Sequence, residues 1–180
     1  RETASAQVKE DMWIKSDGKA FPWLQATKSP SAIGVPGTTA LLWEGHRQFG
    51  RLSWENNFKR SIDLAKEGFI PTPRFLRSIS LARTLGISHS QAFKSLYLPN
   101  DSLPTQKIPF RNLKLATTLS RISRGGITEF YRGDIANELI DDIQQIKDEK
   151  KTINSITNED LANYKVIKRK PVCRKYKSWK

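Results

Sequence analysis

Apolar residues recur at intervals of three and four positions along most of this chain, which is the spacing of helices that bury one face. The first such segment covers residues 38–49, where Leu41, Leu42 and Phe49 lie at near-helical spacing and Gly50 follows as a stop signal. We therefore expect a short helix with a glycine C-cap.

Similar helix start and stop signals recur as far as residue 164. A side chain that can accept the free amide hydrogens of a first turn stands before each apolar stretch, and a glycine or a turn stands after most of them. Helix starts are expected at Ser53, Thr72, Ser88 (a capping box with Gln91), Asn112, Asp134 and Thr157, and stops at Gly68, Gly86, Leu98–Asp101 and Gly125–Gly126. The expected apolar faces are Phe58, Ile62 and Ala65; Phe75, Leu76, Ile79, Ala82 and Leu85; Leu115, Leu119 and Ile122; and Ile135, Leu139, Ile143 and Ile146.

The two ends of the chain lack this periodicity. Residues 1–30 form an extended or irregular lead-in with a turn signal at residues 16–18, and residues 165–180 partly alternate apolar and basic positions, as a half-exposed strand does. Residues 31–164 lie between them as one helical domain. The predicted fold is mainly α, with short β segments at the ends.

The composition is that of a globular protein. With 180 residues, of which 37% are hydrophobic, the chain is long enough to build a core. Every apolar run is far shorter than the roughly 20 residues needed to cross a bilayer, so we expect no membrane span in this segment. The sequence begins at Arg1 without a methionine and shows no signal peptide, which indicates a processed product or a fragment.

The net charge of +13 is concentrated at the C-terminal end. Residues 165–180 carry eight of the 31 basic residues and no acid, whereas the other 164 residues carry 23 basic and 18 acidic side chains. Tyr164, Tyr176 and Trp179 accompany these cations, and cations with flat rings are the combination that binds single-stranded nucleic acid. The alternatives are a nucleic-acid or anionic-surface binding tail and the solvated face of a strand. The absence of a nucleic-acid-binding motif favours the strand, so we expect no nucleic-acid partner.

No residue pattern forms a self-sufficient active site. Cys173, the single cysteine, and the distant histidines His46 and His89 have no metal-ligand spacing, and no serine or threonine stands in a nucleophile motif. The adjacent acids at residues 141–142 and 159–160 would point about 100° apart on a helix, so we expect solvated or capping charges. We expect no catalytic residue, no metal and no cofactor in this chain.

Residues 34–38, Gly-Val-Pro-Gly-Thr, resemble a phosphate-binding turn at a helix start. A P-loop needs a lysine and a hydroxyl residue after its last glycine, and a dinucleotide fold needs a preceding strand. Neither accompanies this segment. We therefore expect residues 34–38 to be a structural entry to the helix.

Five segments, taken in order, carry a family resemblance. They are Arg1–Ala4 (RETA), Ile33–Thr38 (IGVPGT), Ala65–Phe69 (AKEGF), Phe130–Gly133 (FYRG) and Ile156–Lys165 (ITNEDLANYK). Each is short, but together they run nearly end to end along the chain. The combination resembles the γ-glutamyltransferase family, also called γ-glutamyltranspeptidase or glutathione hydrolase.

This resemblance implies the helical part of the large subunit of an N-terminal-nucleophile hydrolase, whose α+β fold is an αββα sandwich. Such a proenzyme cleaves itself, and the new N-terminal threonine of the small subunit attacks the γ-glutamyl amide of glutathione. The γ-glutamyl group then passes to water or to an amino acid or peptide acceptor. By resemblance, the threonine lies beyond Lys180, the partners are glutathione and the small subunit of the same proenzyme, and the location is periplasmic or secreted.

One substrate-binding residue of the family corresponds to a residue of this chain. In the family, the arginine of the Arg-Glu-x-Ala motif holds the α-carboxylate of the γ-glutamyl group, and Arg1 stands in that position. A guanidinium can bind a carboxylate through two parallel hydrogen bonds. The family usually continues this motif with proline, whereas this chain has Ser5, so we expect a less rigid segment. Without the threonine, the isolated chain is expected to be inactive.

Overall fold

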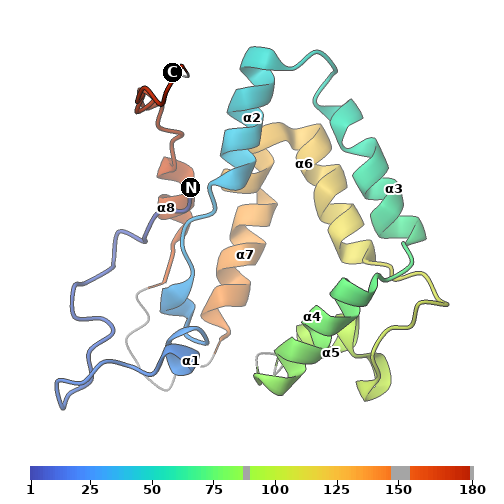
Figure 1. The fold of residues 1–180 in the computed structure, drawn as a ribbon, viewed down its shortest axis with the longest axis horizontal. Helices are drawn as coiled ribbons and strands as arrows, with labels where there is room; N and C mark the ends of the chain where they lie inside the picture. The colour runs from blue at the N-terminus through green and yellow to red at the C-terminus, as the bar shows by residue number, and fades with distance from the viewer. Residues whose placement is uncertain (87–89, 147–154, 179–180) are drawn as a thin grey trace.

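The computed structural model describes residues 1–86, 90–146 and 155–178, and these are mainly helical (Figure 1). The α-helices are α1 (Trp23–Ala26), α2 (Thr38–Phe49), α3 (Lys59–Glu67), α4 (Pro73–Thr84), α5 (Gln91–Tyr97), α6 (Leu113–Tyr131), α7 (Asp134–Gln144) and α8 (Asn158–Asn163). Short 3-10 turns cover Pro30–Ala32, Glu55–Asn57 and Pro99–Asp101. In Figure 1, α2 and α7 lie next to each other, α3 and the α4–α5 pair lie to one side, and α8 lies with the N-terminal lead-in on the other.

Several helix boundaries follow from local side-chain chemistry, as predicted. Thr72 Oγ1 accepts a hydrogen bond from the Phe75 amide (3.2 Å) at the start of α4, and Asn112 Oδ1 accepts one from the Leu115 amide (2.9 Å) at the start of α6. The bounds of α2 and the first residue of α7 are also confirmed. The local pattern therefore determines most of the helix starts.

The predicted boundaries at Ser53, Ser88 and Gly125–Gly126 have different outcomes. Ser53 precedes a 3-10 turn, and α3 begins later, after Phe58. Ser88 lies outside the described residues, and Ser90 caps α5. The predicted stop at Gly125–Gly126 coincides with a sharp break in α6, because Gly126 has the non-helical angles φ 62° and ψ −155°, and a further helical segment then continues to Tyr131.

Aromatic side chains pack around the bend in α6. The Trp54 indole N–H donates a hydrogen bond to the carbonyl oxygen of Ile122 (3.1 Å), one turn before the bend. The Trp43 ring packs edge-on against Trp54, with 5.0 Å between ring centroids. A Cβ atom on Gly126 would lie 3.3 Å from the Trp43 ring. The bend thus fits closely against α2 and the turn that follows it.

The apolar side chains whose spacing marks α2 are exposed. Leu41, Leu42 and Phe49 are 52%, 59% and 81% exposed, whereas Ala40 is buried. The apolar spacing marked a helix correctly, but among the described residues no element covers that side of it. Ala40 instead faces α6, which packs against α2.

The main core lies between the start of α2, the end of α6, α7 and α8. It is built from side chains of segments far apart in the sequence, so it joins the segment before α2 to α8. Its buried members are Val35, Ala40, Tyr131, Ala136, Ile140, Ile143, Ile156 and Leu161.

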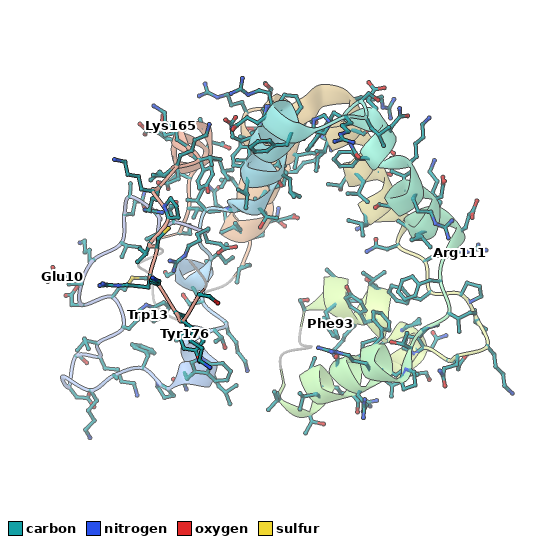
Figure 2. The ribbon with its side chains drawn as sticks, turned by 45° about the horizontal axis from the view of Figure 1, so that its top comes forward. Glu10, Trp13, Phe93, Arg111, Lys165 and Tyr176 are labelled. Atoms are coloured by element: carbon teal, nitrogen blue, oxygen red, sulfur yellow. The ribbon has the colours of Figure 1, made fainter. Side chains whose placement is uncertain are left out.

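A separate aromatic cluster holds the α4–α5 pair to the segments after α3 and before α6. The rings pack mostly edge to face, which is the favoured geometry for such pairs. Tyr97 and Phe110 are instead stacked, at 5.5 Å between centroids. Figure 2 shows Phe93 of this cluster on the opposite side of the molecule from Lys165, which follows α8. The members are Phe69, Phe75, Phe93, Tyr97 and Phe110.

The β segments expected at the ends occur as isolated bridges. Thr3 pairs with Val35, and Ile14 pairs with Ala20 across the predicted turn at residues 16–18. No strand forms over residues 1–30 or 165–178, so the strand-like tail is not a strand among the residues that the structure describes. A strand needs a neighbouring backbone along its length, and these segments have one only at single positions.

Candidate functional site

The site is built around Arg1, whose side chain is exposed and whose backbone is held from the far end of the sequence. The Tyr164 hydroxyl donates a hydrogen bond to the Arg1 carbonyl oxygen at 2.9 Å. Thr3 forms two backbone hydrogen bonds with Val35, of 2.8 and 3.3 Å. The first three residues are therefore tied both to the segment before α2 and to the residue that follows α8.

Gly37 lets these segments approach one another. A Cβ atom at this position would lie 2.3 Å from both the Arg1 carbonyl oxygen and the Tyr164 hydroxyl oxygen. Both distances are far below van der Waals contact, so any side chain here would displace the bond between Arg1 and Tyr164. Residues 34–38 thus form a structural helix entry, as predicted, and they also form one wall of this site.

Two tyrosines fix the geometry of that wall. The Tyr131 ring stacks on the Tyr164 ring, with 5.6 Å between centroids and an interplanar angle of 12°. Tyr131 donates its hydroxyl proton to the Pro36 carbonyl oxygen (2.6 Å) and accepts from the Ala40 amide (3.3 Å). Burial raises the pKa of Tyr131 above its usual value, so the phenol stays protonated and can donate.

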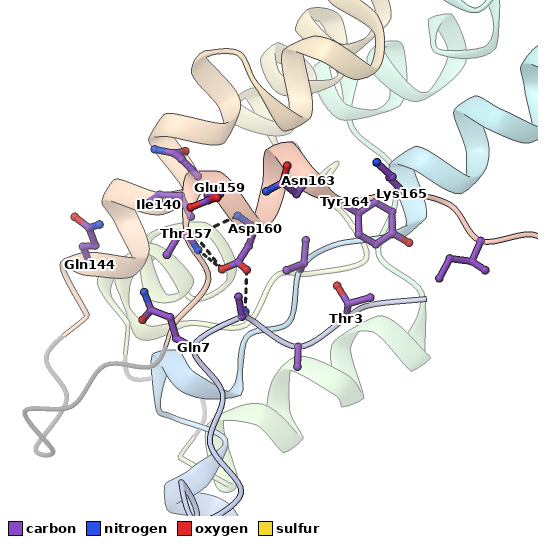
Figure 3. A pocket seen from close by; sticks show the side chains of 15 residues that line it. Thr3, Gln7, Ile140, Gln144, Thr157, Glu159, Asp160, Asn163, Tyr164 and Lys165 are labelled. Atoms are coloured by element: carbon purple, nitrogen blue, oxygen red, sulfur yellow. Dashed lines mark hydrogen bonds between the residues drawn. The ribbon is translucent and has the colours of Figure 1, made fainter.

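A second group of hydrogen bonds holds the other end of the Arg1 segment. The Ala6 amide donates to Asp160 Oδ1 (2.8 Å), and the buried Ser5 hydroxyl oxygen lies 3.0 Å from both Asp160 Oδ2 and the Ser155 carbonyl oxygen. The single Ser5 proton can serve either acceptor. Asp160 also completes the capping box of α8 with Thr157, which is one of the two roles, solvated or capping, expected for this acid (Figure 3).

These bonds set the charge state of Asp160. Burial opposes its ionisation, but hydrogen bonds from the Ala6 amide, from Thr157 and from Ser5 outweigh burial and lower the pKa below the ordinary value of 3.8. A carboxylate with a lowered pKa stabilises the fold at pH values above its unfolded pKa. That contribution is lost as the pH falls through the lower folded value.

An open hollow of about 890 Å³ lies beside these contacts, and Figure 3 shows Thr3, Asp160, Tyr164 and Lys165 around it. Its walls come from the Arg1 segment, α7 and the α8 region. Arg1 does not line this hollow. We therefore place the candidate site at the Arg1 side chain and treat the α8 contacts as its support.

Four of the five segments singled out in the sequence meet here. The segments 1–4, 33–38, 130–133 and 156–165 supply the contacts described above, and Arg132 adds a hydrogen bond to the Ala162 carbonyl oxygen (2.6 Å). The remaining segment, 65–69, lies at the aromatic cluster, where Gly68 adopts φ 93°. One motif, at residues 65–69, thus has a local structural role, whereas the other four lie together near Arg1.

Arg1 could be singled out from its motif, but the residues that support it could not. From the sequence, Tyr164 is an aromatic residue beside the basic tail, and Ser5 is a departure that lowers rigidity. Their partners lie more than 150 positions away, so no local pattern could reveal these bonds. The capping-box spacing at Thr157 was the only local signal for Asp160.

The basic tail is partly engaged within the fold. Lys168 Nζ lies 3.4 Å from Glu44 Oε1 of α2, and Glu44 also accepts from Arg47 and Gln48. The bond from Arg47 contributes most to lowering the pKa of Glu44, to about 2. Nothing among these contacts favours the nucleic-acid alternative for the tail.

The other reactive or metal-binding side chains do not form a site among the described residues. Cys173 is exposed, and the described residues contain no group of three His, Cys, Asp or Glu side chains that could hold a metal ion. Among the described helices, none combines the length and apolar character needed to traverse a bilayer.

Comparisons with known proteins agree with this arrangement. A family model described as Gamma-glutamyltranspeptidase matches residues 1–180. Glutathione hydrolase 3 of Arabidopsis thaliana is 34% identical over 168 residues, which cover 92% of this chain and 24% of that protein. A glutathione hydrolase proenzyme of Pseudomonas aeruginosa is 32% identical over 181 residues, which cover 96% of this chain and 29% of that protein.

Solved structures show the same fold. The crystal structure of Helicobacter pylori gamma-glutamyltranspeptidase matches with a TM-score of 0.86 and 28% identity, over 98% of this chain and 49% of that chain. The chain spans about a quarter of the length of the curated relatives it matches. It therefore belongs to the γ-glutamyltranspeptidase family and forms a mainly helical part of such a protein.

Proposed function

We propose that this chain is the part of a γ-glutamyltransferase or glutathione hydrolase that holds the substrate's α-carboxylate, with Arg1 as the binding residue. The parent protein would cleave the γ-glutamyl amide of glutathione and pass the group to water or to an amino acid or peptide. The observation that supports this proposal is the convergence of four family motifs around the segment that begins with Arg1.

The chemistry of Arg1 suits this role. Its side chain is exposed while its carbonyl is fixed, so the guanidinium can reach a ligand from a defined starting point. Two parallel charge-assisted hydrogen bonds would bind and orient a carboxylate, and a lysine cannot reproduce that geometry. Uniform binding of this kind lowers KM without contributing to the bond-breaking step.

The nucleophile would come from another part of the parent protein. An N-terminal threonine exposed by self-cleavage can use its own α-amino group as base, and the small subunit would supply it. We therefore expect that the purified chain of residues 1–180 releases no product from a γ-glutamyl anilide.

The full-length enzyme tests the role of Arg1. Arg1→Ala should raise KM for the γ-glutamyl donor about 10- to 100-fold, because hydrogen bonds to a charged group contribute roughly 1.5–3 kcal/mol. kcat should change little, and Arg1→Lys should recover only part of the loss. Arg51→Ala, which removes an exposed arginine after α2, is the control and should leave KM unchanged. A normal KM in Arg1→Ala would remove Arg1 from the site.

A further inference from the structure

The segment of residues 155–164, which contains α8, holds the Arg1 segment at two points. At one end, Ser155 and Asp160 hold Ser5 and Ala6, and at the other end Tyr164 holds the Arg1 carbonyl. The same short element thus fixes both ends of a six-residue stretch.

Only the Tyr164 contact is made to the residue that carries the guanidinium. The Tyr164 hydroxyl donates to the Arg1 carbonyl, which is separated from the Arg1 side chain by one backbone carbon. The position of the Arg1 carbonyl sets the orientation of the peptide plane next to the carbon from which the Arg1 side chain projects. Stacking on Tyr131 keeps the Tyr164 ring in place, and Tyr131 is itself tied to Pro36 and Ala40.

Gly37 supports the same conclusion independently. The space that its missing side chain leaves is occupied by both the Arg1 carbonyl oxygen and the Tyr164 hydroxyl oxygen. Its φ of −108° is open to any residue, so this close approach is what excludes a side chain at position 37. The local structure therefore accommodates the bond between Arg1 and Tyr164.

We propose that Tyr164 is a positioning residue for substrate binding, which acts through the Arg1 backbone and does not touch the substrate. This inference rests on the proposed role of Arg1. The hydroxyl holds the Arg1 peptide so that the guanidinium meets a carboxylate in the geometry that two parallel hydrogen bonds require. Such bonds depend strongly on orientation, so a small displacement of the peptide weakens them.

Tyr164→Phe in the full-length enzyme isolates this contribution. The substitution removes the hydroxyl and keeps the ring that stacks on Tyr131. KM for a γ-glutamyl anilide should rise about threefold to tenfold, the range expected for one hydrogen bond, with kcat unchanged. Tyr97→Phe removes a phenol hydroxyl in the distant aromatic cluster and should leave both constants unchanged.

Gly37→Ala provides a second variant that keeps both tyrosines. Its new methyl group would force the Arg1 carbonyl and the Tyr164 hydroxyl apart, so it should raise KM in the same way as Tyr164→Phe. It takes the place of Tyr164→Phe if that protein does not mature. Subunit processing on a gel and the melting temperature identify folded enzyme before the kinetics are measured.

A double variant distinguishes positioning from a general structural effect. If Tyr164 acts through Arg1, Tyr164→Phe should not raise KM further when Arg1 is already alanine. An equal rise in both backgrounds would overturn the inference, and so would a Tyr164→Phe enzyme that behaves like Tyr97→Phe while Arg1→Ala is impaired. If Arg1→Ala itself has a normal KM, the proposed function fails, and the inference fails with it.

Discussion

At the scale of single residues, Ser5 shows how a departure from a family pattern can be compensated by distant chemistry. Proline would restrict the backbone locally, and serine would be expected to loosen it. Instead, the Ser5 hydroxyl is buried, accepts from the Gln7 amide (3.1 Å) and lies within hydrogen-bond distance of Asp160 and Ser155. The rigidity that a proline ring would supply comes here from hydrogen bonds.

Ser5→Ala should therefore destabilise the protein by about 1–3 kcal/mol, because it leaves buried polar groups without their partner. The control is Ser95→Ala, which removes an exposed hydroxyl bonded to the Ala92 carbonyl within α5 and should cost less than about 0.5 kcal/mol. Denaturant unfolding of the two variants measures both values. Equal stability of both would show that the Ser5 contacts add nothing.

At the scale of elements, local patterns predicted where helices lie better than which sides they bury. Capping residues and glycines act within a few positions, so the bounds of α2 and the starts of α4, α6 and α7 could be found from the sequence. The glycine pair at residues 125–126 also marked the break in α6, but not the helical segment that continues beyond it. A glycine pair gives the same signal whether a helix ends or turns, and here the packing of Trp43 and Trp54 decides between them.

Two glycines in helices should respond in opposite directions to the same substitution. Gly126→Ala should destabilise by about 1–3 kcal/mol, because its backbone conformation is essentially restricted to glycine and its Cβ would press on Trp43. Gly45→Ala in α2 meets no atom within 4 Å and should stabilise by about 0.5–1 kcal/mol. Melting temperatures of the two variants test this, and a stabilising Gly126→Ala would contradict a required bend.

At the scale of the whole molecule, the chain exposes far more surface than a compact protein of its size. Its accessible surface is 13,872 Å². A compact monomer of 20.6 kDa would expose about 8,900 Å². The exposed apolar side of α2 is part of this excess, and the chain spans only about a quarter of the length of the curated relatives it matches.

Leu42→Lys should therefore have different effects in two contexts. In the isolated chain, Leu42 is 59% exposed, and the change should cost less than about 0.5 kcal/mol. In the full-length protein, where we expect this face to be covered, a buried lysine should cost several times more. Paired melting curves and soluble yields make the comparison. The same small effect in both would show that Leu42 stays exposed in the whole protein.

Some residues of the candidate site could be predicted from local sequence, and others depend on distant segments. Short motifs singled out Arg1 as a candidate and the helix start at Thr157, and they left Asp160 as a solvated or capping charge. The hydroxyl of Tyr164 and the space at Gly37 depend on segments that meet only in the fold, so their roles could not be predicted. The whole chain determines which motif residues become neighbours.

The contact between Arg1 and Tyr164 also has a consequence for the order of folding. It joins positions 163 residues apart, so it can form only after nearly all of this segment has left the ribosome. At about 5–20 residues per second, Tyr164 emerges roughly 10–30 s after Arg1. Contacts of such large sequence separation also form late for entropic reasons. Arg1 would thus acquire its final position near the end of folding, after the helices that surround it have assembled.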